Sequence, residues 1–234
     1  MQISCAGGGR VMNERVLVEQ LPLSGARGLE LGCGTARQTR LLAGSGKFST
    51  ILALEVDQRQ HQKNLALTDL PGVRFALGGA EAIPAADGSF DAVFLFKSLH
   101  HVALDRLGDA FAEIRRVLAP GGLVYISEPV FDGDYNEIMR LFHDEERVRE
   151  AAFDATRAAV DSGRFALVSQ TFFLAPVAFK GFAEFEQKVI DVTHTEHRLS
   201  PELYRQVRDK FESYMTVDGA KFEAPFRVDL LRKI

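Results

Sequence analysis

Short apolar segments alternate with stretches of helical periodicity through the first 130 residues of this chain. Strand candidates lie at 25–34, 49–57, 73–77, 90–96 and 123–127. The last three are bounded by Gly, Pro or Asp and are apolar on both faces, which is typical of strands in the buried middle of a parallel sheet. Between the last two, apolar residues recur three and four positions apart, which indicates a helix that packs one side on the sheet. This βαβ rhythm predicts a doubly wound α/β fold.

The later part of the chain has a different character. A charged helical stretch runs from 134 to about 160 and leads to a strand candidate at 164–174. A strict alternation of apolar and charged residues at 221–230 predicts a half-exposed antiparallel strand at the end. Between these strands, 181–215 holds two amphipathic helices, the second with Ser200 as its N-cap.

Together these elements predict a mostly parallel sheet of seven strands, the last antiparallel, in a single domain over 1–234. The core of that domain spans about 25–130. The helices in 181–215 must bury their apolar sides, so we expect a cap which, with the helix at 134–160, walls a pocket above the carboxyl edge of the sheet. Packing on the outer sheet face or in a dimer interface is the alternative. The apolar sides are formed by Phe182, Phe185, Val189 and Val192, and by Leu203, Val207 and Phe211.

Composition and charge exclude several classes of protein. Hydrophobic residues make up 46% of the 234 residues and charged residues 26%, which is ordinary globular usage. The net charge is −4 and no segment concentrates Lys and Arg, so we expect no nucleic-acid partner. The longest apolar run, 90–96, is far too short to cross a membrane, and the first ten residues lack a secretion signal. Cys5 and Cys33 cannot form a disulfide framework, so we expect a reducing cytoplasm. Nothing in the sequence indicates an oligomeric state.

A glycine-rich turn follows the first strand. Gly32 and Gly34 end that strand, and a helix begins near Thr35. In a parallel sheet this turn lies at the carboxyl edge, where backbone N–H groups and the positive end of a helix can receive a ligand. The dinucleotide fingerprint needs a third glycine three residues after Gly34, but Arg37 stands there. Arg37 weakens the prediction of a nicotinamide-dependent oxidoreductase, which stays an alternative.

Four motifs occur in order over about 25–130. They are Glu30-Leu31-Gly32-Cys33-Gly34-Thr35, Leu54-Glu55-Val56-Asp57, Ala80-Glu81-Ala82-Ile83-Pro84 with Gly88-Ser89-Phe90-Asp91, and Arg116-Val117-Leu118-Ala119-Pro120-Gly121-Gly122. This arrangement resembles the class I S-adenosylmethionine-dependent methyltransferases, in particular the methyltransferase type 11 group. The resemblance implies a Rossmann-like fold that binds S-adenosylmethionine, forms S-adenosylhomocysteine and methylates a small molecule, with 131–234 on the acceptor side. A protein that holds the cofactor without turnover is the main alternative.

The resemblance also implies which residues face the cofactor. Glu55 would accept hydrogen bonds from both ribose hydroxyls, each worth roughly 1.5–3 kcal/mol, and capping of the next helix is its alternative role. Glu30 would face the ammonium group. Gly79 stands where the family commonly has Asp, so the adenine would be held by the backbone of Gly79 and Ala80 or by Glu81. The residues expected at the cofactor are Glu30, Gly32, Cys33, Gly34, Glu55, Val56, Gly79, Ala80, Glu81, Phe96 and Lys97.

Catalytic candidates lie at the same sheet edge. His100 and His101 follow the fourth strand of the pattern, and Glu128 ends the fifth. Methyl transfer is an in-line displacement in which alignment of the two reactants does most of the work, so a general base is optional. Each histidine is therefore either a base or a residue that caps or packs the next helix.

Other polar residues of the later region suggest a metal only weakly. His143-Asp144-Glu145 and the pair His194 and His197 lack the spacing of a structural zinc site, so we expect no metal. The segment 94–97 differs from the Asn/Asp-Pro-Pro-aromatic motif of the family's branch that methylates amino groups of nucleic acids. We expect a small-molecule acceptor, and the sequence determines neither its identity nor whether O, N, C or S is methylated.

Overall fold

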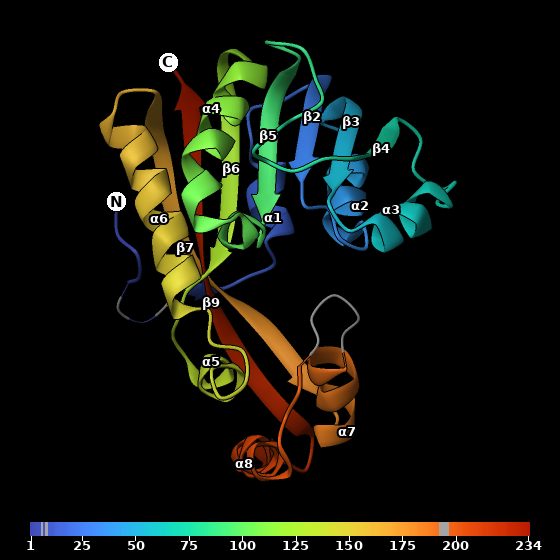
Figure 1. Ribbon diagram of the computed structural model, residues 1–234, viewed down its shortest axis with the longest axis vertical. Coiled ribbons are helices and arrows are strands. Elements are labelled where there is room, and N and C mark those ends of the chain that lie inside the picture. The colour runs from blue at the N-terminus through green and yellow to red at the C-terminus, as the bar shows by residue number, and fades with distance from the viewer. Residues whose placement is uncertain (6, 8, 192–196) are drawn as a thin grey trace.

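A nine-stranded sheet organises the computed structural model, which describes residues 1–5, 7, 9–191 and 197–234 (Figure 1). Its seven long strands lie in the order β4-β3-β2-β5-β6-β9-β7. Of these strands, β9 alone runs in the opposite direction to the others. The two-residue strands β1 and β8 pair with β7 and β9. The predicted seven-stranded, mostly parallel sheet is confirmed, with β1 and β8 as additions. The strands are β1 (Arg10–Val11), β2 (Ala26–Leu31), β3 (Phe48–Glu55), β4 (Val73–Leu77), β5 (Phe90–Phe96), β6 (Leu118–Pro129), β7 (Phe165–Phe179), β8 (Met215–Thr216) and β9 (Gly219–Lys233).

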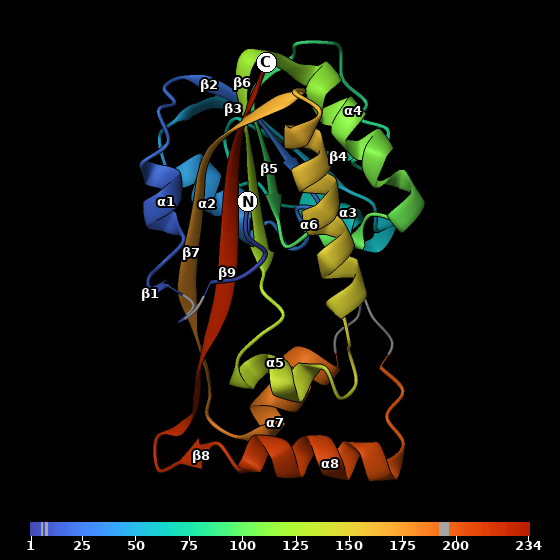
Figure 2. The same cartoon turned by 90° about the vertical axis from the view of Figure 1, so that its left-hand side faces the viewer.

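Helices cover both faces of the sheet (Figure 2). On one face lie α1 (Arg15–Glu19) and α2 (Arg37–Gly44), and on the other lie α4 (Leu107–Val117) and α6 (Glu146–Asp161). Successive residues of a strand point to opposite faces, so Val93 and Phe94 of the central strand β5 belong to different hydrophobic clusters. This double burial explains why β5 is apolar throughout its length except for Asp91. No helix among the described residues is long and apolar enough to cross a membrane.

The segment predicted as one helix over 134–160 is broken, so that prediction was wrong. The structure has α5 (Asp134–Met139) and α6 (Glu146–Asp161), separated by residues 140–145. The Oδ1 atom of Asp144 accepts a 3.0 Å hydrogen bond from the N–H of Glu146, a local turn that competes with a continuous helix. Two short 3₁₀ helices, Leu99–His101 and Leu104–Arg106, also precede α4 where the periodicity suggested one helix.

The cap is carried by β7 and β9, which are fifteen residues each and extend beyond the rest of the sheet. It contains α7 (Phe182–Phe185), a π-helical turn at Glu186–Ile190 and α8 (Pro201–Glu212), and Figures 1 and 2 show these beside α5, beyond the carboxyl ends of the parallel strands. Ser200 caps α8 as predicted. The described apolar side chains form one cluster with α5, as predicted for a cap, whereas Val192 lies outside the described residues. Its most buried members are Ile138, Phe185, Val207 and Phe211.

Candidate functional site

The turn between β2 and α2 requires glycine at two positions. Gly32 and Gly34 have φ angles of +74° and +50°, in the left-handed region that favours glycine. A Cβ atom on Gly32 would lie 2.7 Å from the Cβ of Ser98, which follows β5. A Cβ atom on Gly34 would meet nothing within 4 Å. The turn therefore presents bare backbone to open space at the carboxyl edge of the sheet.

Glu55 joins the end of β3 to this turn. Its Oε2 atom accepts a 2.7 Å hydrogen bond from the N–H of Gly34, and its Oε1 atom accepts bonds of 2.9 and 3.0 Å from the N–H groups of Val56 and Asp57. A carboxylate has about four acceptor positions and these backbone bonds use three of them, so one position on Oε2 remains for a ligand over the turn. Capping of α3 (Gln58–Leu65) is performed by Asp57, which accepts a 2.8 Å bond from Arg59.

Asn64, on α3, supports the turn from the other side. Its Nδ2 atom donates a 2.8 Å hydrogen bond to the carbonyl oxygen of Gly34, and only 1% of the residue is exposed. Sequence reasoning missed Asn64, because a polar residue on a polar helix gives no local signal. Its role depends entirely on how α3 packs against the turn.

Glu30 is a buried carboxyl group with an unused oxygen. The residue is 1% exposed at the end of β2, and its Oε2 atom has no hydrogen-bond partner among the described residues. Burial raises the pKa of Glu30 to about 8. A buried acid of this kind is costly unless a cation or donor pairs with it. The positively charged ammonium group of S-adenosylmethionine would supply the partner that this oxygen lacks, so Glu30 fits the cofactor.

The residues predicted at the adenine end lie together beyond β3 and β4. Val56 is 65% exposed directly after Glu55, which leaves an apolar side chain available to a flat ring. Gly79 is bridged to Ala82, and Ala80 between them is buried. A Cβ atom on Gly79 would lie 2.5 Å from Oε2 of Glu81, so the Glu81 carboxylate fills the space that a side chain at position 79 would take.

Phe96 and Lys97 end β5 in different environments. Phe96 is 6% exposed and stacks on Phe94, so its ring belongs to the core. Lys97 has a left-handed φ of +55° and is exposed at the edge of the cavity described below. The protein around its ammonium group, together with Arg37, lowers the pKa of Lys97. Cys33 is a buried free thiol in the turn, and burial raises its pKa.

Glu14 is a further carboxylate that sequence reasoning missed. It precedes α1, and its oxygens accept hydrogen bonds of 3.2 Å from the hydroxyl of Tyr125 and 3.1 Å from the amide of Gln38. Burial raises the pKa of Glu14. No motif marks it, since it reaches the sheet edge from an N-terminal segment outside the four motifs.

His100 and Glu128, both predicted, are in direct contact at the carboxyl edge. The Nδ1 atom of His100 lies against Oε2 of Glu128, while Oε1 of Glu128 accepts a 2.9 Å bond from the N–H of Leu99. The two side chains are each 3% exposed. On its other side, Nε2 of His100 is 3.6 Å from Oε1 of Glu145. Burial alone would lower the pKa of His100, but the carboxylates of Glu128 and Glu145 outweigh it and raise this pKa to about 9.

Three more residues complete this group, which we call the histidine–glutamate cluster: His100, His101, Glu128, His143 and Glu145. The ring of His101 is 4.1 Å from that of His100, measured between centroids, and it is exposed. Burial and the charge of His100 lower the pKa of His101. The Nε2 atom of His143 is 2.8 Å from Oε1 of Glu145.

Glu145 is also held by Arg149 from α6. The Nη2 atom of Arg149 donates a 2.7 Å hydrogen bond to Oε2 of Glu145, and its Nη1 atom donates one of 3.2 Å to Oδ1 of Asn136. Burial would raise the pKa of Glu145, but His100 and Arg149 hold it well below its usual range. The sequence singled out Glu145 only as part of a rejected metal pattern.

A cavity of about 420 Å³ separates the sheet edge from the cap. The cluster forms one wall, α5 a second, and the cap together with β9 the remainder. Polar and apolar side chains both line this space, and the cluster is its densest group of ionisable residues. His194 lies outside the described residues, but His197 lines this cavity. The other lining residues are Lys97, Pro129, Val130, Asp132, Tyr135, Asn136, Met139, Arg149, Val177, Lys188, Val189, Ala224, Pro225 and Phe226.

The part of the chain that carries these features matches a known protein family. Residues 29–126 match the type 11 family model described as "Methyltransferase domain". An uncharacterized methyltransferase of Synechocystis is 31% identical over 117 residues, which cover 50% of this chain and 53% of that protein. An O-methyltransferase of Penicillium expansum is 32% identical over 130 residues, which cover 53% of this chain and 45% of that protein.

Solved structures show the same fold over nearly the whole chain. The YcgJ protein from Bacillus subtilis aligns with a TM-score of 0.66 and 15% identity, over 93% of this chain and 96% of the other. The chain spans about a third to about half of the length of the first curated relatives it matches. The family match covers the segment that bears the glycine turn, Glu55 and the histidines after β5.

Proposed function

Because this chain carries a class I S-adenosylmethionine-dependent methyltransferase domain, we propose that it transfers a methyl group from S-adenosylmethionine to a small molecule held in the 420 Å³ cavity. The observation that carries the proposal is the unpaired Oε2 atom of Glu30, buried beside the glycine turn. An enzyme that binds a cationic amino acid group there gains a partner for this carboxyl group.

The proposed cofactor site follows the turn from Glu30 to Glu81. Glu30 receives the ammonium group, the backbone of Gly32, Cys33 and Gly34 lies under the methionyl and ribose parts, and the free position on Oε2 of Glu55 accepts from a ribose hydroxyl. When bound, the cofactor supplies an electrophilic methyl group on its sulfonium sulfur. The remaining proposed contacts are Val56, Gly79, Ala80 and Glu81 at the adenine, and Phe96 and Lys97 near the methionyl group.

The proposed catalytic group is the cluster, in which His100, His101, His143 and Glu145 border the cavity and Glu128 supports His100 from outside the lining. His100 and Glu128 were the predicted residues, and their contact holds the His100 ring in one orientation. His101 is exposed beside them, and Glu145 adds a carboxylate from the loop before α6, far along the chain. We assign to these residues the orientation and activation of the acceptor's nucleophilic atom.

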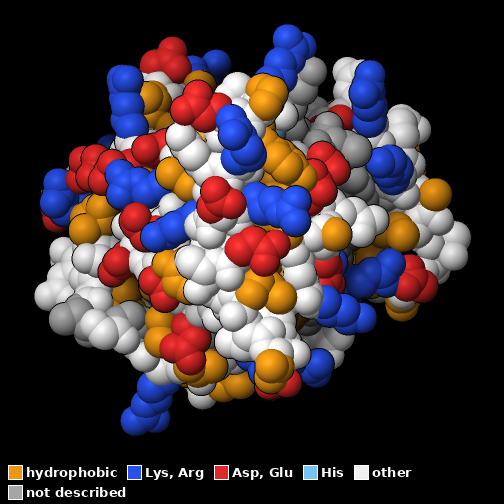
Figure 3. All heavy atoms as spheres, turned by 90° about the horizontal axis from the view of Figure 1, so that it is seen from below, with side chains coloured by type: hydrophobic (Ala, Val, Ile, Leu, Met, Phe, Trp, Pro, Cys, Tyr) orange, Lys and Arg blue, Asp and Glu red, His pale blue; other side chains and the backbone are white. Residues whose placement is uncertain are grey.

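The size of the cavity and the mixture of residues that line it favour a compact, partly apolar acceptor. Val130, Met139, Val177 and Val189 supply apolar lining, while the cluster supplies the polar side. Seen from the cap end, Lys and Arg are interspersed with Asp and Glu, with no single-sign area on that face (Figure 3). This distribution supports the expectation that folded nucleic acid is not the acceptor. Cys5 and Cys33 are free thiols, which supports a reducing cytoplasm as the compartment.

Two alternatives remain distinguishable by experiment. A non-catalytic binding protein would hold S-adenosylmethionine without turnover, and a nicotinamide oxidoreductase would prefer NAD. Arg37 begins α2 where the dinucleotide fingerprint needs glycine, which disfavours the second.

The test combines a binding and a turnover measurement on the full chain. S-adenosylhomocysteine should raise the thermal midpoint, because a ligand that binds only the folded state stabilises it, and NAD should not. A labelled methyl donor incubated with fractionated metabolite pools should then label a small molecule. Stabilisation by NAD alone would refute the proposal, and cofactor binding without labelling in any pool would favour the binding protein.

A further inference from the structure

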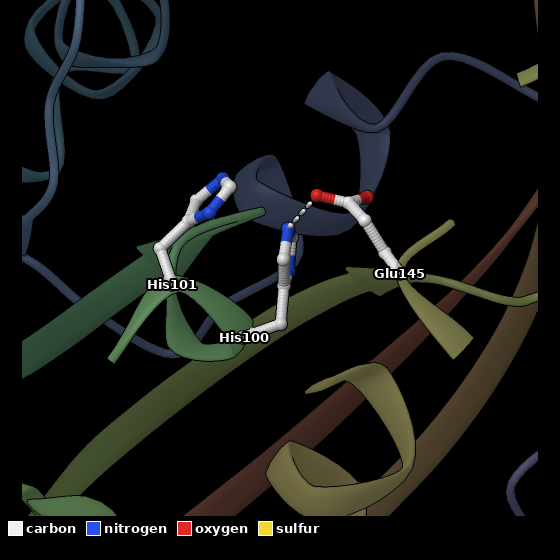
Figure 4. Close-up of side chains that lie close together, drawn as sticks. All are labelled: His100, His101 and Glu145. Carbon is white, nitrogen blue, oxygen red and sulfur yellow. Dashed lines mark ion pairs between the residues drawn. The ribbon is translucent and has the colours of Figure 1, made fainter. Parts of the chain in front are cut away.

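Three side chains of the histidine–glutamate cluster place metal-ligating atoms around one point (Figure 4). The ligating atoms of His100, His101 and Glu145 all lie within 4.8 Å of one another. A zinc ion about 2.1 Å from each ligand would draw such atoms to within about 4 Å. Since His101 is exposed, rotation of its side chain is enough to close that difference.

The two more buried candidate ligands, His100 and Glu145, are each held in their orientation by a neighbouring charged side chain. His100 directs Nδ1 at Glu128, which leaves Nε2 directed at Glu145. Oε2 of Glu145 receives the 2.7 Å hydrogen bond from Arg149, and Oε1 lies between His143 at 2.8 Å and His100 at 3.6 Å. A carboxylate behind a metal-binding histidine, and a donor behind a metal-binding carboxylate, are typical of metal centres. These supporting contacts distinguish the group from a chance meeting of polar side chains.

We propose that His100, His101 and Glu145 bind one divalent ion of the zinc type. Two imidazole nitrogens and one carboxylate oxygen form a ligand set that zinc uses when a further position stays open for water or substrate. His143, 2.8 Å from Glu145, holds that carboxylate at the cavity side. The open position faces the cavity that His100, His101 and Glu145 all line.

This inference rests on the proposed function for the role that the ion would have. The binding of the ion itself does not depend on that function. An acceptor hydroxyl or thiol at the open position would be held beside the cofactor turn, and coordination would favour its deprotonated form. From the sequence we expected no metal, because the spacing of these residues matches no structural zinc motif. A site assembled from a 3₁₀ helix after β5 and from the loop before α6 has no such spacing.

The test is metal binding by the full chain, measured without any acceptor. After treatment with EDTA and dialysis, the protein is titrated with ZnCl₂ by calorimetry and with CoCl₂ by visible absorption. We expect one ion per chain, with a Co²⁺ spectrum of four- or five-coordinate geometry. His101→Ala and Glu145→Gln should each lower zinc affinity by about 100-fold or more, and Arg149→Met by about tenfold.

Two matched variants serve as controls. Glu137→Gln removes an exposed carboxylate of α5, and His61→Gln removes a histidine of α3, so both should bind zinc as the unaltered chain does. His101 is exposed, so His101→Ala keeps the test decisive if Glu145→Gln fails to fold. Absence of stoichiometric binding, or equal binding by His101→Ala, would overturn the proposal. Binding of S-adenosylhomocysteine by the EDTA-treated chain tests the proposed function separately, because that function needs no metal for cofactor binding.

Discussion

The carboxylate of Glu55, at the end of β3, accepts a 2.7 Å hydrogen bond from the backbone N–H of Gly34, in the turn after β2. The residue proposed for the cofactor ribose therefore also fixes the turn on which that ribose would lie. A carboxylate has room for both tasks, because it has about four acceptor positions and the backbone uses only three of them. Loss of Glu55 should accordingly affect the cofactor twice, through a missing contact and through a looser turn.

Glu55→Ala should weaken S-adenosylhomocysteine binding by about 1.5 kcal/mol or more, because charge-assisted hydrogen bonds are lost. Glu55→Gln should fall between it and the unaltered chain, since the amide keeps one accepting oxygen. Calorimetric titration of both variants measures the effect, with Glu19→Ala on the exposed side of α1 as the control. An unchanged affinity in folded Glu55→Ala would remove Glu55 from the ribose site.

Glu30→Gln should make the protein more stable at pH 8 while it binds the cofactor less well. The folded-state pKa of Glu30, about 8, lies above its ordinary value of 4.5. This group therefore favours the folded state below pH 4.5, and its contribution is lost as pH rises to 8. The neutral amide suffers no such loss, so the variant should gain roughly 1–3 kcal/mol at pH 8 and little at pH 4. Urea unfolding at the two pH values measures the difference.

Cofactor binding at pH 7 should release a proton from Glu30. At that pH the buried acid is mostly protonated, and pairing with an ammonium group requires its carboxylate form. Calorimetry in buffers of different ionisation enthalpy measures the proton release, which should be much smaller in Glu30→Gln. A binding enthalpy that does not depend on the buffer in the unaltered chain would contradict the pairing.

Gly79→Asp alone should not strengthen adenine binding as strongly as the family's usual Asp suggests. The new side chain would meet the Glu81 carboxylate, which already lies against Gly79, and the two negative charges would repel. Glu81→Ala should weaken S-adenosylhomocysteine binding about tenfold, and adding Gly79→Asp to it should restore the affinity. Equal affinities for Glu81→Ala and the unaltered chain would show that Glu81 does not contact the adenine.

Val189→Trp should reduce methylation without changing cofactor binding. Val189 lies in the cap and lines the cavity, so a larger side chain would occupy space proposed for the acceptor. Val217→Trp is the matched control, because Val217 is fully exposed in the turn before β9. The readouts are S-adenosylhomocysteine affinity and the yield of labelled methyl product. Full product yield from folded Val189→Trp would place the acceptor elsewhere.

The sequence by itself determined the strand segments, the glycine turn and the place of the helical insertion between the last two long strands. Each depends on a local pattern: Phe90–Phe96 is apolar because both faces of β5 are covered, and Gly32 is glycine because a side chain there would strike Ser98. Ser200 likewise marks the start of α8, because its hydroxyl oxygen accepts a hydrogen bond from the N–H of Leu203. Local patterns of this kind can be read without knowledge of the rest of the chain.

Only the tertiary structure decided how the polar residues meet. His100, Glu128 and Glu145 come from a 3₁₀ helix, a strand and a loop, and the loop exists because the helix predicted over 134–160 breaks at 140–145. Asn64 reaches Gly34 across thirty positions of sequence. Such contacts depend on the packing of whole elements against one another, and hydrophobic periodicity specifies which side of an element is buried but not which polar atom it meets.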